Sequence, residues 1–139
     1  MSDDPTIGRV RVKPGVEFTL IASSGFRLLG AIEHAARALG MDVTITSACD
    51  GEHSGPTDPH KTGRAYDVRS NNLTDAQASA LLEAILDYCR DGDEGPALPV
   101  SGIPRSLATL SFFGFIEEPD QLNEHIHVQL RKGRTYPGA

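Results

Sequence analysis

The strongest constraint on the fold is the alternation of helix-like and strand-like apolar patterns along a chain of 139 residues. In the segment 25–39, apolar residues recur at intervals of three or four positions, namely Phe26, Leu29, Ile32, Ala36 and Leu39. This is the period of an amphipathic helix, and Gly40 is suited to end it. The next segment, MDVTITSA at 41–48, alternates apolar and polar residues and is rich in β-branched side chains, which predicts a strand.

A second helix is predicted in the segment 71–90, NNLTDAQASALLEAILDYCR. Thr74 can cap its first turn while the side chain of Gln77 reaches back to the cap, which is the pattern of a capping box. The side chains expected on its inner face are Leu81, Leu82, Ile85, Leu86 and Cys89. The stretch 90–102 is rich in Gly, Pro and acidic residues, and we interpret it as a surface loop within one domain.

The C-terminal part of the chain adds further strand patterns. The segments 108–118 and 125–131 are predicted to be paired strands, joined across a turn in which Pro119 and Asp120 are typical turn residues. Helices that lie beside a small, mainly antiparallel sheet define an α+β domain. The sequence therefore predicts a single α+β domain spanning residues 1–139, with two main helices packed beside the sheet.

Composition narrows the classes of partner. The chain has 13 Lys and Arg against 19 Asp and Glu, and its one basic concentration is RKGR at 131–134, which argues against a nucleic-acid partner. No segment approaches the ~20 apolar residues of a membrane span, and the N-terminus lacks the features of a secretory signal, so we expect a soluble protein made in the cytoplasm. We also expect a monomer. Cys49 and Cys89 have no CxxC spacing. Reduced thiols are expected, with one local disulfide as the alternative.

Residues 64–69, RAYDVR, place an acid within an apolar strand pattern. On a strand, Asp67 shares a face with Ala65, and so small a neighbour is expected to leave open space above the sheet. His60 lies seven positions before Asp67 and must therefore approach from a turn, which Gly63 permits. A histidine and a carboxylate that converge in this way supply two of the three protein ligands of a catalytic zinc site.

The segment NEHIHVQL at 123–130 offers the remaining groups. His125 and His127 are two apart and point to the same side of a strand, and the apolar neighbours of His127 make it the better candidate for the third ligand. Glu124 can join the site as a general base if the chain bends where the strand begins. A loop acid for Glu124 and a partly exposed strand histidine for His125 are the alternatives.

Both segments together resemble a known family. HKTGRAYD matches HxxGxAxD and EHIH matches ExxH, the two motifs of the zinc peptidases that include D-alanyl-D-alanine carboxypeptidases, dipeptidases and phage L-alanyl-D-glutamate endopeptidases. The resemblance covers roughly residues 42–130. It implies one zinc ion per chain bound by His60, Asp67 and His127, with Glu124 as the general base. In the wider superfamily, with lysostaphin-like and hedgehog-like members, the first histidine of an HxH pair lines the active site, which implies a catalytic role for His125.

Other residues become candidates where the chain departs from that pattern. Many members have a serine two residues before the first metal histidine, and here Asp58 stands in that place and could orient the imidazole of His60. Members that recognise a terminal carboxylate have an arginine soon after the first strand, and Arg64 or Arg69 is a candidate to replace it. His53 is a surface histidine expected near the cleft and a candidate for substrate contact.

The residues and the resemblance together predict a zinc-dependent peptidase, and the resemblance alone implies that its substrates are peptides of the bacterial cell wall. The arginine expected of a carboxypeptidase is missing, so we favour an endopeptidase, such as a phage lysin that reaches the wall after the membrane is permeabilised. A cytoplasmic carboxypeptidase or dipeptidase is the close alternative. The alternative from a different class is a non-catalytic metal-binding module with the same fold, such as a virion component.

Overall fold

The computed structural model describes residues 6–18, 21–48, 63–117 and 121–131. Its elements are β1 (Thr6–Ile7), β2 (Val10–Val12), α1 (Ser23–Leu39), β3 (Val43–Ser47), β4 (Ala65–Arg69), α2 (Asp75–Tyr88), β5 (Ser106–Ala108), β6 (Phe112–Glu117) and β7 (His125–Leu130). The strands form one sheet in the order β1-β2-β3-β4-β7-β6-β5. Every neighbouring pair is antiparallel except β2 and β3, which are parallel.

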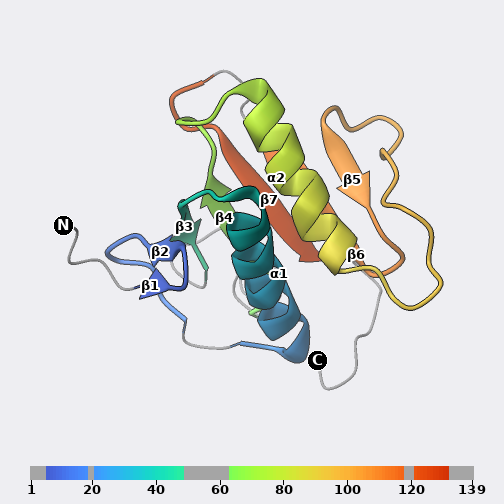
Figure 1. Ribbon diagram of the computed structural model, residues 1–139, viewed down its shortest axis with the longest axis horizontal. Coiled ribbons are helices and arrows are strands. Elements are labelled where there is room, and N and C mark those ends of the chain that lie inside the picture. The colour runs from blue at the N-terminus through green and yellow to red at the C-terminus, as the bar shows by residue number, and fades with distance from the viewer. Residues whose placement is uncertain (1–5, 19–20, 49–62, 118–120, 132–139) are drawn as a thin grey trace.

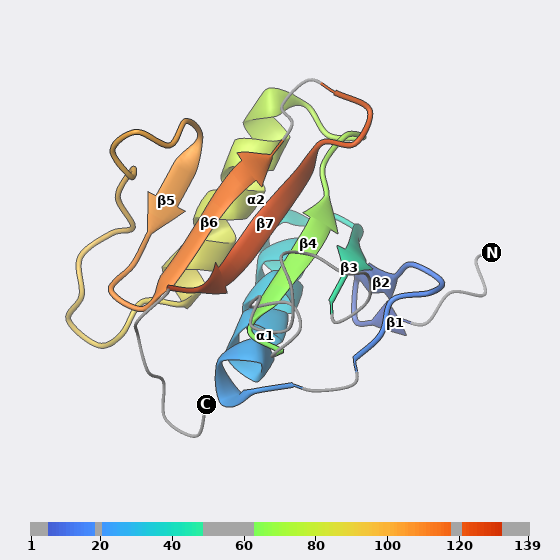
Figure 2. The ribbon, with the colours of Figure 1, turned by 180° about the vertical axis from the view of Figure 1, so that it is seen from behind.

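Both helices pack against the same face of the sheet (Figure 1). Viewed from behind, β4, β7 and β6 lie in front of the helices, and no described helix covers this second face (Figure 2). The predicted α+β class is confirmed. Within the described residues, no helix is both long enough and apolar enough to cross a membrane.

The first predicted helix is confirmed, but its inner face is rotated from the expected one. Phe26 is 62% exposed and Leu39 is 38% exposed, so these two members of the predicted stripe are wrong. The face that packs inward consists of Leu28, Ala31, Ile32, Ala35 and Ala36. Its three alanines allow the helix axis to come close to the sheet and to α2, which larger side chains would prevent. Gly40 ends the helix as predicted, with φ 66°.

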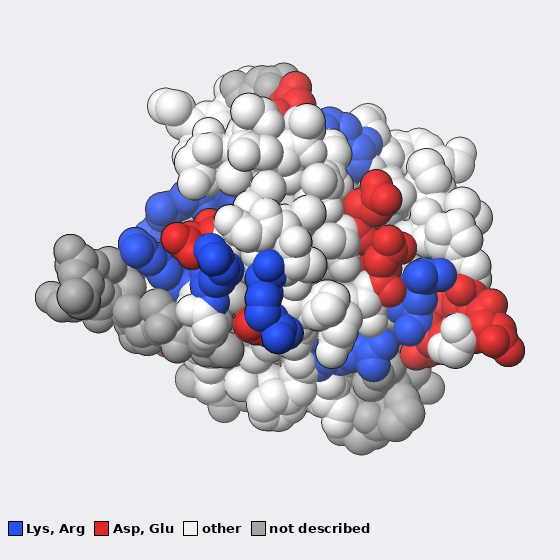
Figure 3. Space-filling view, viewed as in Figure 1, with Lys and Arg blue, Asp and Glu red and all other residues white. Residues whose placement is uncertain are grey.

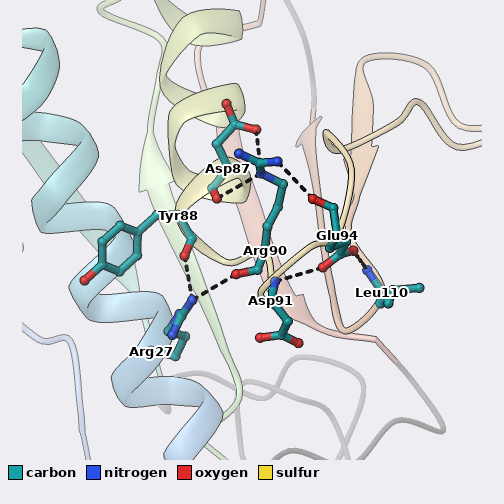
Figure 4. A network of polar contacts seen from close by, with 7 residues as sticks. All are labelled: Arg27, Asp87, Tyr88, Arg90, Asp91, Glu94 and Leu110. Carbon is teal, nitrogen blue, oxygen red and sulfur yellow. Dashed lines mark hydrogen bonds and ion pairs between the residues drawn. The ribbon is translucent and has the colours of Figure 1, made fainter.

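The second helix has the predicted capping box. The backbone N–H of Gln77 donates to Thr74 Oγ1 at 3.1 Å, and the N–H of Thr74 donates to Gln77 Oε1 at 2.9 Å. All five side chains predicted for the inner face are buried. At the other end, the Arg27 guanidinium from α1 donates to the carbonyls of Tyr88 at 2.7 Å and Arg90 at 3.3 Å (Figure 4). A cation placed there satisfies carbonyls that the helix itself leaves without partners.

The strands near the site alternate strictly between the two faces of the sheet. In β7, Ile126, Val128 and Leu130 are buried on the helix side, so the intervening residues His125, His127 and Gln129 lie on the opposite face. The predicted pairing of the last two strands is confirmed by the register of β6 and β7. Of the strand expected over 108–118, β6 takes up only Phe112–Glu117, and Ala108 ends the separate strand β5, because Thr109 turns the chain by accepting from the N–H of Phe112 at 2.9 Å. The short strands β1 and β2 were not expected.

Candidate functional site

Two of the predicted zinc ligands lie side by side on neighbouring strands. Asp67 of β4 and His127 of β7 are cross-strand partners on the face opposite the helices. His127 Nδ1 lies 3.0 Å from Asp67 Oδ1, and each side chain is 14% exposed. The antiparallel register therefore brings together a carboxylate and an imidazole that are 60 residues apart in sequence.

The other nitrogen of the His127 ring is held by Gln129. Its Nε2 lies 2.7 Å from Gln129 Oε1, while the amide nitrogen of Gln129 donates to the carbonyl of Leu130 at 3.1 Å. Because that amide uses its N–H group on a carbonyl, its oxygen faces the ring and accepts a hydrogen from Nε2. The Nδ1 atom is then the one that shares a cation, either a proton or a metal ion, with Asp67.

The surroundings of His127 change its pKa in both directions. Burial of the ring lowers the pKa of His127, whereas the hydrogen bond and negative charge of Asp67 raise it. Gln129 and the charge of Glu117 act in the same direction, so the pKa of His127 lies above its ordinary value of 6.5. The metal-free pair thus favours a positive charge at Nδ1. The ring of Phe115 packs beside it, with the ring centroids 5.2 Å apart.

His125 lies on the same face and links three strands. Its Nε2 is 2.5 Å from Glu117 Oε2 of β6 and 3.8 Å from Asp67 Oδ2 of β4, and its Nδ1 is 2.9 Å from the carbonyl of Asn123. Glu117 and Gln129 are the contributors that sequence reasoning missed. The alternation of β6 and β7 puts both on this face, but only the register between the strands shows which residues meet.

Glu124 follows a turn at 122–123 and directly precedes β7. Its N–H donates to the carbonyl of Gln121 at 3.1 Å, and its carbonyl accepts from the N–H of Ser70 at 3.4 Å. The Glu124 side chain is 5% exposed, and its Oε1 lies 3.9 Å from Nη1 of Arg105. Arg105 also lies 3.7 Å from Asp75 at the start of α2. The carboxylate is therefore buried beside a cation.

A cavity of about 360 Å³ opens at this end of the sheet. Asp67, Glu124 and His125 line it together with two cations, Lys13 and Arg69. Arg64, the other arginine proposed from the sequence, precedes the opposite end of β4 and does not line this cavity. Three of the groups proposed for the site and two positive charges therefore line the same cavity.

Four residues singled out in the sequence belong to a segment that the structure does not describe. His60, Asp58, His53 and Cys49 lie outside the described residues. In the ranges that are described, no three His, Cys, Asp or Glu side chains form a complete group for a metal ion. The open space expected above Ala65 is wrong, because Ala65 is fully buried although it does not belong to the core beneath the helices.

Side chains of both charges lie on the surface, as expected from a composition with 13 Lys and Arg and 19 Asp and Glu. On the helix side of the molecule, the described Lys and Arg side chains are interspersed with Asp and Glu (Figure 3).

No family model, curated protein or solved structure was found to match this chain.

Proposed function

We propose that this protein is a zinc-dependent peptidase that hydrolyses peptide bonds in the stem peptides of bacterial peptidoglycan. The observation that carries the proposal is the contact of 3.0 Å between Asp67 and His127. A carboxylate oxygen and an imidazole nitrogen are donors that zinc accepts. Gln129 orients the ring from its other nitrogen, as hydrogen-bond acceptors do behind metal-binding histidines.

The proposed metal ligands are His60, Asp67 and His127, for one zinc ion per chain. A bound zinc ion would supply the positive charge that acidifies a water molecule and polarises a peptide carbonyl. Asp67 and His127 fit this role because a carboxylate oxygen and an imidazole nitrogen converge there, 3.0 Å apart. His60 is included because it is the first histidine of the motif HxxGxAxD.

The other groups of the site would handle protons and the substrate oxygen. Glu124 would take a proton from the attacking water and pass it to the leaving amine. Glu124 lines the cavity that Asp67 and His125 also line, which supports this role. The Nδ1 atom of His125 faces the carbonyl of Asn123, so Nε2 would be the nitrogen that donates a hydrogen bond to the oxygen that becomes negative as water adds to the carbonyl, in exchange for its contact with Glu117.

A second candidate function is favoured by one observation. Arg105 lies beside the buried Glu124 carboxylate, so this acid also suits a purely structural role at the start of α2. In that case the protein would be a non-catalytic metal-binding module, with the metal serving to stabilise the fold.

Glu124→Gln separates the two functions. The matched control is Glu83→Gln, because Glu83 is an exposed acid on α2. For a peptidase, Glu124→Gln keeps zinc but no longer cleaves purified peptidoglycan fragments, while Glu83→Gln cleaves them as the wild type does. For a structural module, zinc-loaded wild type cleaves neither these fragments nor small D-amino-acid peptides, and Glu124→Gln changes only the free energy of unfolding.

A further inference from the structure

We infer that Lys13 and Arg69 form a subsite for a substrate carboxylate next to the reacting groups. The inference rests on the proposed peptidase function and adds to it the class of peptide that the site selects. It also assigns a ligand to two cations that have no side-chain partner within the described residues.

The two cations come from different strands and meet at one cavity. Lys13 directly follows β2, where its N–H donates to the carbonyl of Ile45 at 3.0 Å. Arg69 ends β4 and is the cross-strand partner of His125. Both side chains are exposed, and both line the cavity of about 360 Å³ that Asp67 and His125 also line. A group bound by these cations would therefore lie beside the proposed catalytic centre.

The charges within the described residues leave these two cations uncompensated. Neither the Lys13 nor the Arg69 side chain has a hydrogen bond or an ion pair there, whereas Arg9, Arg37 and Arg90 each pair with an acid. The acids that line the same cavity have other partners. Asp67 contacts His127 and Glu124 lies beside Arg105. An anion from outside is what would balance Lys13 and Arg69.

The chemistry of the two side chains favours a carboxylate. The guanidinium of Arg69 offers paired N–H donors that match the two oxygens of a carboxylate, and the Lys13 ammonium adds a mobile point charge. In a peptide substrate this carboxylate is either the free C-terminus or an acidic side chain near the cleaved bond. The register selects Arg69 over Arg64, because only Arg69 is at the end of β4 where His125 and the cavity lie.

The test measures equilibrium binding of small peptides to the zinc-loaded Glu124→Gln variant, which prevents turnover. The probes are N-acetylated D-alanine dipeptides that end in a carboxylate or in an amide, and an amidated dipeptide with a glutamate side chain. We expect the carboxylate peptide to bind about tenfold more tightly than the neutral amide. Adding Arg69→Met should remove most of this preference and Lys13→Met a smaller part. Arg37→Met, which removes an exposed arginine on α1, should preserve it.

The glutamate peptide identifies the source of the carboxylate. If it binds as tightly as the free C-terminus, the subsite accepts a side-chain carboxylate, and if it binds like the neutral amide, the subsite requires the terminus; either pattern supports the inference. Equal affinity for all three peptides would overturn it, as would a preference that survives the Lys13→Met/Arg69→Met double variant or depends on Arg64 instead.

Turnover of the same peptides by wild type separates this inference from the function on which it rests. A binding preference without any cleavage would keep the subsite and reject the peptidase. Cleavage without a preference in binding would reject the subsite alone.

Discussion

Replacing Gln129 with methionine should weaken zinc binding while leaving the fold intact. Gln129 Oε1 lies 2.7 Å from Nε2 of His127, and this contact fixes the hydrogen on Nε2. Methionine has a similar length but no comparable acceptor, so the ring is free to turn or to carry its hydrogen on Nδ1, which faces Asp67. Loss of such an orienting partner typically lowers metal affinity about 10–100-fold, which corresponds to about 1.4–2.8 kcal/mol.

The assay is a competition titration of zinc against a chromogenic chelator. Gln121→Met is the matched control, since Gln121 is exposed and is not among the hydrogen-bond partners of the His127 ring within the described residues. Circular dichroism should show the same secondary structure for both variants. If Gln129→Met bound zinc as tightly as wild type, the inference that His127 binds metal through Nδ1 would be refuted.

Three further predictions concern stability and reactivity. Arg27→Met should lower the free energy of unfolding in urea by about 2 kcal/mol, because a charged donor to two carbonyls is lost, whereas Arg37→Met should change it by less than about 0.5 kcal/mol; equal effects would contradict the capping role. The raised pKa of His127 means that folding binds its proton more tightly, so the metal-free protein should keep this stabilisation below pH 6.5 and lose it as pH rises through the folded pKa. Urea unfolding across that range should show the loss in wild type and not in Asp67→Asn, and a loss of equal size in the variant would contradict the pairing. Burial raises the pKa of Cys89 to about 12, so its alkylation, followed by peptide mapping, should be far slower in native protein than in urea, and similar rates would show that the thiol is accessible.

The elements predicted well are those determined by local sequence. The capping residues Thr74 and Gln77 and the apolar residues of α2 interact within one helix, so their pattern is visible in the chain. The inner face of α1 differs from the predicted one because the face that packs is rich in alanine and leaves large apolar residues outside. Phe26 is a large apolar residue that tertiary packing leaves on the surface.

Only the site residues that belong to the two sequence motifs, or stand close to them, could be predicted. The alternation of β7 correctly placed His125 and His127 on one face, opposite the buried Ile126. The partners Glu117 and Gln129 depend on cross-strand register and on side-chain hydrogen bonds, which follow from contacts between distant parts of the chain. The ion pair between Glu124 and Arg105 was missed for the same reason.

The central claim is that zinc held by this site cleaves wall peptides, and mass spectrometry of muropeptides tests it most directly. Purified muropeptides are incubated with zinc-loaded protein and, in parallel, with protein from which zinc has been removed by a chelator. We predict new peptide fragments, each pair accounting for the addition of one water, only in the zinc-loaded sample. Intact muropeptides in both samples, or the same fragments without zinc, would contradict the claim.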